Sequence, residues 1–258
     1  MSIVLISIFL TGCWITPPPE PNIVNYRGFF VGVGKYENGL TLLSPAENTD
    51  KLEDLFTQCK FGEDETQFQV IKKLINYDAT KENILNGIDD IFCEADDNDV
   101  SYFYYMGHGG VKNGIPIITA TDSTGCVCKD ITVHELEAHL SMIPGTKVVL
   151  LETCHAGNFI DKGERIILEP FDEFSLDLLN KEGYQVLTSS AGNQYTWDSS
   201  NGSYFCNALI AGCENLIADT NKDEIVDLYE LYKYIKFHVT KQTVQIYPEN
   251  SNFTVIEY

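Results

Sequence analysis

The feature that most constrains the fold is a set of short runs in which apolar residues are continuous instead of alternating. They lie at residues 29–34 and 148–151, and residues 100–106 form a third segment that is rich in Tyr and Phe. A continuous apolar run of this length indicates a strand that is buried on both faces. Further strands are expected at residues 68–75 and 184–188, with a last one near Val244 or Phe253.

Segments with a helical spacing of apolar residues separate these strands. Ser44 is expected to cap the first helix, because a proline follows it and an acid lies three residues on. Thr80 and the Thr132–Glu135 capping box begin two further helices, and residues 203–211 and 227–238 have the pattern of two more. Strands that alternate with helices predict an α/β fold of three layers (αβα), with a mostly parallel six-stranded sheet.

The N-terminal segment has the pattern of a targeting signal. Residues 1–12 carry no charge and are mostly apolar, and they are about half as long as the ~20 residues that span a bilayer. They lead into Leu-Thr-Gly-Cys13, which resembles a bacterial lipobox in which the cysteine is lipidated; the alternative is an apolar N-terminus with an incidental cysteine. Residues 13–24 are proline-rich and suit a tether. We therefore expect a membrane-anchored lipoprotein outside the cytoplasm, with one domain over residues 25–258.

The charge of the chain excludes one class of partner. Against 17 Lys and Arg residues stand 38 Asp and Glu residues, which gives a net charge of −21. A surface this acidic repels the phosphate backbone, so we expect no nucleic acid as a partner. Cationic ligands and basic peptides suit it better.

The candidate chemistry follows the third and fourth expected strands. The third ends in Met-Gly-His108-Gly-Gly and the fourth in Glu-Thr-Cys154-His-Ala-Gly. If these strands are neighbours, their ends lie about 5 Å apart, at the edge of the sheet where α/β proteins form their sites. An imidazole facing a thiol can take its proton for nucleophilic attack and later return it. The alternative for Cys154 is a buried free thiol.

Together and in this order, the two motifs resemble the histidine and cysteine motifs of caspase-like cysteine peptidases, a group that includes caspases, metacaspases, legumains, clostripain and gingipains. His108 lies 46 residues before Cys154, and a caspase histidine lies about 50 residues before its cysteine. The resemblance implies a caspase-like fold and an endopeptidase in which Cys154 attacks the peptide carbonyl and His108 transfers the proton. It also implies an oxyanion hole made by the N–H groups of Gly109 and Cys154. His155 would have a structural role.

The resemblance extends to the specificity pocket. Residues 186–191 resemble the strand that lines it, which implicates Ser189 and Ser190 in substrate binding. Glu152 matches the position where metacaspases place an acid that binds Arg or Lys, although legumains also carry Glu there and cut after Asn. Asp198 is a second candidate acid, or else a solvated loop residue. We expect substrates that are basic at the cleaved residue. The alternatives are an Asn-specific, legumain-like peptidase or transpeptidase, and a non-catalytic binding module on the same scaffold.

Two other patterns concern metals. The reaction requires no cofactor, but calcium is a candidate ligand because residues 219–230 have the spacing of an EF-hand loop, with Glu224 where that loop has Gly. The alternative is a solvated turn that caps the next helix. Cys126 and Cys128 suit either a metal or a disulfide. The candidate calcium ligands are Asp219, Asn221, Asp223, Ile225, Asp227 and Glu230.

Overall fold

The computed structural model of the chain describes residues 23–162 and 178–258. The predicted signal segment at residues 1–12, the predicted lipidation site Cys13 and most of the predicted tether lie outside the described residues. Within the described ranges, no helix has the length and apolar character needed to cross a membrane.

A six-stranded sheet forms the centre of the molecule, in the order β10-β8-β7-β3-β1-β2. Five of its strands run parallel, and β10 is antiparallel to β8. The two central strands β3 and β7 are almost completely buried, as their continuous apolar runs predict. The bounds are β1 (Tyr26–Gly32), β2 (Phe68–Ile75), β3 (Val100–Met106), β7 (Thr146–Glu152), β8 (Tyr184–Thr188) and β10 (Gln245–Tyr247).

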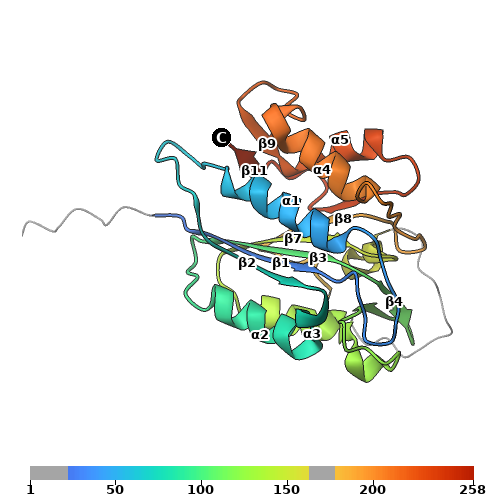
Figure 1. Ribbon diagram of the computed structural model, residues 1–258. Coiled ribbons are helices and arrows are strands. Elements are labelled where there is room, and N and C mark those ends of the chain that lie inside the picture. The colour runs from blue at the N-terminus through green and yellow to red at the C-terminus, as the bar shows by residue number, and fades with distance from the viewer. Residues whose placement is uncertain (1–22, 163–177) are drawn as a thin grey trace, which may run out of the picture.

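Helices cover both faces of this sheet (Figure 1). On one face lie α1 (Pro45–Thr57), α4 (Tyr204–Cys213) and α5 (Leu228–His238), and on the other lie α2 (Lys81–Phe92) and α3 (Val133–Leu140). Alternate residues of each strand enter two separate hydrophobic clusters, one on each side of the sheet. The predicted three-layer αβα fold with a mostly parallel sheet is confirmed.

Two small antiparallel sheets lie outside the central one. β4 (Gly109–Lys112), β5 (Ile115–Ile118) and β6 (Ile131–Thr132) form the first, and β9 (Ile225–Asp227) pairs with β11 (Thr254–Glu257) in the second. Both places considered for the last strand are strands, since β10 joins the central sheet and β11 joins β9. Short 3-10 turns lie at η1 (Asn76–Asp78), η2 (Val127–Lys129), η3 (Ala156–Ile160) and η4 (Glu214–Leu216).

The residues that begin three of the helices differ in whether their side chains bind a nearby or a distant group. Thr80 accepts the N–H of Asn83, and Thr132 forms the predicted capping box with Glu135. Ser44 is the N-cap residue of α1 as predicted, but its hydroxyl does not make the expected capping bond. Its hydroxyl donates instead to the carboxylate of Asp198, far along the chain. A bond to a charged acceptor is stronger than one to a neutral acceptor, so the distant carboxylate is preferred.

Candidate active site

The two motifs meet because β3 and β7 are neighbours in the sheet. Met106, the last residue of β3, is in register with Glu152, the last residue of β7. The loops that carry His108 and Cys154 therefore leave the same edge of the sheet side by side, where doubly wound sheets form their binding sites.

A cavity of about 320 Å³ lies at this edge. It is lined by residues of both loops, by the segment before α1 and by the segment after β8. The structure thus brings four candidate site residues into one cavity: His108, Cys154, Glu152 and Asp198. The whole lining is Leu42, Met106, Gly107, His108, Glu152, Cys154, Tyr195, Thr196, Trp197 and Asp198.

Two buried tyrosines hold the backbone of His108. Its N–H donates to Tyr36 Oη at 2.7 Å, and its carbonyl accepts from the Tyr105 hydroxyl at 2.7 Å and from the N–H of Thr119 at 2.9 Å. The imidazole lies beside the Tyr36 ring, with 5.0 Å between ring centroids. At Gly107 a Cβ would lie 2.4 Å from Tyr105 Oη, so this arrangement needs a glycine there. The sequence analysis missed Tyr36 and Tyr105; the tyrosine-rich third strand was a sign of Tyr105, and no pattern pointed to Tyr36.

The imidazole of His108 is poised to accept a proton. Its Nε2 atom is buried and has no hydrogen-bond partner among the described residues. Burial lowers the pKa of His108, which favours the neutral ring at pH 7. Burial also raises the pKa of the Cys154 thiol. A neutral thiol and a neutral imidazole that line the same cavity suit general-base activation at the moment of attack.

The loop of Cys154 is held from behind by the end of β8. Ser190 Oγ donates to the carbonyl of Thr153 at 3.1 Å and accepts the N–H of Ala156 at 3.2 Å. Ser189 Oγ also lies within hydrogen-bond distance of the Thr153 carbonyl, at 3.4 Å. Both serines are completely buried. The expectation that their side chains contact substrate needs correction, because neither serine lines the cavity. Both hydroxyls bind the cysteine loop, and Ser189 Oγ also forms a hydrogen bond with Oγ1 of Thr196, a residue that does line the cavity.

His155 has the structural position that was expected. Its φ of +62° turns the chain sharply after Cys154. Its N–H donates to the carbonyl of Gln194 at 2.7 Å, and Nδ1 lies 2.9 Å from the carbonyl of Gly192. These bonds tie the cysteine loop to the segment after β8. Gly109 is equally constrained, since a Cβ there would lie 2.3 Å from Thr153 Oγ1.

Glu152 is completely buried yet has an oxygen without a partner. The Tyr104 hydroxyl donates to Oε2 at 2.9 Å, while Oε1 has no hydrogen bond within the described part of the chain. Burial raises the pKa of Glu152 to about 7; the Ser203 and Tyr104 hydroxyls and the N–H of Cys206 oppose this rise, and the nearby charge of Asp198 adds to it. A buried carboxyl short of donors is a strong acceptor for a cationic group.

Asp198 is a fixed residue of the cavity and not a freely solvated acid. Oδ2 accepts the N–H groups of Leu43 and Ser44 at 2.9 and 3.2 Å, and Oδ1 accepts the N–H of Ser199 at 2.8 Å. The Ser44 hydroxyl adds a further bond. The segment before α1 is thereby attached to the cavity wall beside Glu152.

In the candidate calcium loop, the carboxylates already accept hydrogen bonds from backbone N–H groups of the same loop. Oxygens of Asp219, Asp223 and Glu230 lie within 4.8 Å of one another, which fits the oxygen ligands that calcium prefers. Glu224 makes the sharp turn with a φ of +69°, in place of the missing Gly. Asp227 caps α5 and forms a capping box with Glu230, as the alternative interpretation of a helix-capping turn requires. Two candidate ligands remain. The side-chain amide of Asn221 and the backbone N–H of Ile225 each donate to the carboxylate of Asp223.

The structure joins Cys126 and Cys128 in a disulfide, the second of the two alternatives for this pair. The other cysteines of the described residues are free thiols, and Cys93 is exposed while Cys154 is partly exposed.

Comparisons with known proteins agree with this architecture. The chain matches the caspase domain family over residues 28–255. Among solved structures it is similar to protein GSU0716 from Geobacter sulfurreducens, with a TM-score of 0.64, 14% identity, and coverage of 86% of this chain and 92% of the other. It is also similar to caspase-1 from Spodoptera frugiperda, with a TM-score of 0.62, 13% identity, and coverage of 91% and 89%.

At these identities the structural likenesses show the fold alone. No curated protein matches the sequence. The family match, however, spans most of the chain and includes both the histidine and the cysteine loops. The chain therefore belongs to the caspase domain family, and its function is that of a cysteine peptidase-like protein.

Proposed function

We propose that this protein is a cysteine endopeptidase that cuts after Arg or Lys and uses Cys154 and His108 as a catalytic dyad. One observation carries the specificity: the buried carboxyl of Glu152, with Oε1 unpaired, lies in the same cavity as both dyad residues. Family membership supports the peptidase class, and the cavity supports the choice of substrate.

The proposed reaction begins with a neutral pair. His108 Nε2 takes the proton of the Cys154 thiol as the sulfur attacks the scissile carbonyl carbon. The N–H groups of Gly109 and Cys154 stabilise the oxyanion that forms. The imidazolium then protonates the leaving amine, and an acyl-enzyme remains on Cys154. Water, activated by the same imidazole, attacks the acyl carbon and releases the free acid and the thiol.

The proposed specificity comes from the carboxyl of Glu152, which lines the cavity. With a pKa of about 7, Glu152 is partly protonated while the cavity lacks a cation. A guanidinium or ammonium group favours the ionised carboxylate and pairs with Oε1, and the negative charge of Asp198 strengthens the attraction. The apolar stem of the side chain would lie against Leu42 and Trp197, which also line the cavity.

The same pKa gives the Asn-specific alternative its one supporting observation. A protonated Glu152 is a neutral hydrogen-bonding group, and such a group suits an amide better than a cation. Transpeptidation is a separate variant of this alternative, in which an amine replaces water in the attack on the acyl-enzyme. The third alternative, a binding module without catalysis, uses the same cavity but no attack by Cys154.

The proposal includes the location of the protein. The lipobox-like residues before Cys13 support a lipid anchor and a position outside the cytoplasm, with protein or peptide substrates there. Incorporation of labelled fatty acid in cells, lost in Cys13→Ser, tests the anchor. Calcium would be held by Asp219, Asp223 and Glu230 as a stabiliser of the loop before α5, and no step of the reaction uses it.

The experiment that tests the function uses fluorogenic peptides that end in Arg, Lys, Asn or Asp. We expect cleavage after Arg or Lys, complete loss in Cys154→Ala, and no change in Cys93→Ala, which removes an exposed thiol elsewhere. Cleavage only after Asn would favour the legumain-like alternative. A folded protein that is inactive on all four peptides and unreactive to thiol reagents at Cys154 would favour the binding module.

A further inference from the structure

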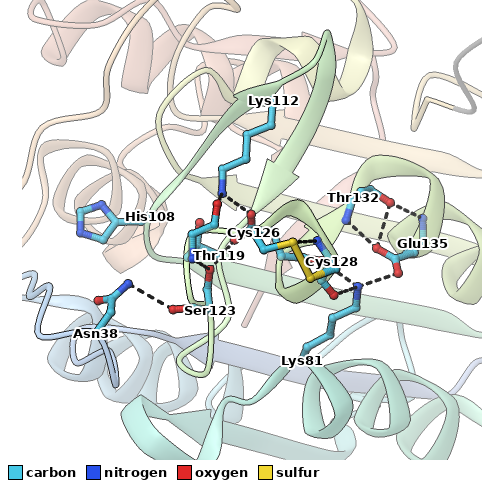
Figure 2. A network of polar contacts seen from close by, with 12 residues as sticks. Asn38, Lys81, His108, Lys112, Thr119, Ser123, Cys126, Cys128, Thr132 and Glu135 are labelled. Atoms are coloured by element: carbon cyan, nitrogen blue, oxygen red, sulfur yellow. Dashed lines mark hydrogen bonds and ion pairs between the residues drawn. A yellow bond between two sulfur atoms is a disulfide. The ribbon is translucent and has the colours of Figure 1, made fainter.

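The loop between β5 and β6 contains a disulfide that the proposed peptidase reaction does not use. It joins Cys126 and Cys128, which are separated by one residue (Figure 2). Both cysteines are exposed to solvent, so a thiol in solution can reach the sulfurs. Exposed disulfides are those that tend to be labile, regulatory or catalytic, whereas structural disulfides are usually resistant to reduction.

The disulfide closes too short a loop to contribute much to stability. A cross-link restricts the unfolded chain less as the number of residues between the two cysteines falls. Here that number is one. The contribution of this bond to the fold is therefore small, and its presence needs another reason.

Other contacts hold the loop in shape independently of the disulfide. Asp130 is completely buried, and its carboxylate accepts the Ser123 hydroxyl at 2.8 Å and forms an ion pair with Lys112. Lys112 Nζ also donates to the carbonyl of Gly125 at 3.0 Å, and Lys81 Nζ donates to the carbonyl of Asp130 at 2.8 Å. Figure 2 shows the two lysines reaching the loop from opposite sides. The loop can thus keep its shape when the S–S bond opens.

The local charge favours the approach of a thiolate. The whole chain has a net charge of −21, but Lys81, Lys112 and Lys129 all contact this loop or its carboxylates. Their charges balance Asp122, Asp130 and Glu135, with which they form ion pairs. An anionic thiolate therefore meets less repulsion here than over the rest of the surface.

One hydrogen bond distinguishes the two sulfurs. The N–H of Cys128 donates to Sγ of Cys126 at 3.3 Å. This bond stabilises a thiolate on Cys126 more than one on Cys128, and the more stable thiolate is the better leaving group in exchange. The attack is therefore directed to Sγ of Cys128.

We propose that Cys126 and Cys128 form a reversible thiol–disulfide exchange site whose reductant is a dithiol, either a small molecule or a protein dithiol. One thiolate of the reductant attacks Sγ of Cys128, forms a mixed disulfide and releases the Cys126 thiolate, which takes a proton. The second thiolate of the reductant attacks its own sulfur in the mixed disulfide and releases Cys128. The reductant gives two electrons and becomes a disulfide, and the protein gains two thiols; a disulfide oxidant reverses the reaction.

The test uses the whole folded protein and dithiothreitol as the dithiol. Trypsin cuts after Lys112 and Lys129, and the peptide of residues 113–129 contains these two cysteines and no others. Before reduction, alkylation of the native protein is expected to leave this peptide unlabelled while Cys93 is labelled. After native treatment with dithiothreitol, the peptide gains two labels. Dialysis against oxidised glutathione returns it to the unlabelled state.

Two further measurements test whether reduction leaves the protein folded and which cysteine the thiol attacks. The melting temperature of the reduced protein, and of the double variant Cys126→Ser with Cys128→Ser, is expected to lie within about 2 °C of the oxidised wild type, because the closed loop is short. With a monothiol and an acid quench, the mixed disulfide is expected on Cys128. The proposal is overturned if the peptide is labelled before reduction or if reduction requires a denaturant. An adduct on Cys126 overturns the direction of attack.

Discussion

Glu152 and Glu230 are both buried glutamates, and they differ in how their oxygens are satisfied. Glu152 has one bond, from Tyr104, and its Oε1 has no partner in the described ranges. Glu230 accepts from the N–H and hydroxyl of Thr220 at 2.9 and 2.7 Å through Oε1, and from Asp227 through Oε2. The first carboxyl lies in a cavity, while the second is enclosed by its own loop.

The comparison shows why burial alone does not identify a binding residue. A carboxylate whose loop supplies the donors is stable without a ligand, and burial then serves the fold. A carboxyl that lacks donors is costly in its charged form, and the cost is lifted when a cation arrives. Only the structure separates these cases, because both residues are acids at plausible motif positions.

The largest expected effect comes from Glu152→Gln. The amide retains the shape but loses the charge, so we expect kcat/KM for peptides ending in Arg to fall ~100-fold, since breaking a buried charge pair is strongly unfavourable. The matched control is Glu230→Gln, which alters the other buried carboxyl and is expected to leave kcat/KM unchanged. Equal losses in the two variants would contradict the assignment of Glu152.

Next in size is the effect of pH on binding of the cation. The pKa of Glu152 is raised to about 7, so the carboxyl is neutral below that pH and ionised above it. The affinity of Cys154→Ala for a peptide ending in Arg should therefore rise with pH through 7, by up to ~10-fold per unit on the acid side. Calorimetry at several pH values measures it. The dependence should vanish when Glu152→Gln is added to the same variant, and a dependence that persists would point to another group.

A smaller effect is expected on stability from Glu230→Gln. The change removes one acceptor oxygen from N–H and hydroxyl donors in the loop before α5, and we expect a loss of ~1–2 kcal/mol in the free energy of unfolding. Urea denaturation followed by circular dichroism measures this loss. In Glu152→Gln the stability is expected to be unchanged or higher, because a buried acid with an unpaired oxygen is removed. A destabilised Glu152→Gln together with an unaffected Glu230→Gln would reverse the comparison.

The smallest expected effect is that of calcium on the loop around Glu230. Saturating calcium is expected to raise the melting temperature of the wild type by ~2–4 °C through preferential binding to the folded state. Asp223→Ala should abolish the shift, and magnesium at the same concentration should produce less of it. No shift in the wild type, or the same shift in Asp223→Ala, would leave the loop as a helix-capping turn only.

Much of the fold is readable from the sequence because its signals are local. Continuous apolar runs mark β3 and β7 as doubly buried strands, and Thr80 and Thr132 cap helices through residues three positions away. The proposed dyad can be predicted from the sequence for the same reason. His108 and Cys154 each follow a strand, and the ends of the two strands meet when the strands are neighbours in the sheet.

The failures concern side chains whose partners are distant in the sequence. Ser44 has the pattern of a cap, but its hydroxyl binds Asp198. Ser189 and Ser190 follow the strand expected to line the pocket, yet their hydroxyls bind the backbone of the cysteine loop, and that of Ser189 also binds the hydroxyl of Thr196. A local pattern fixes which groups are available and not which acceptor lies closest after folding.

The sequence by itself determined the layered α/β architecture, the position of the histidine and cysteine motifs at the ends of two strands, and the candidate acids, because periodicity and strand ends are properties of short segments. That these two strands are neighbours was decided by the sheet topology. The tertiary structure alone decided which acid has a free oxygen, which tyrosines hold His108, and how the lysines support the Cys126–Cys128 loop. These outcomes depend on which donors and acceptors the packed chain brings within hydrogen-bond distance, and that is set by contacts between residues far apart in the sequence.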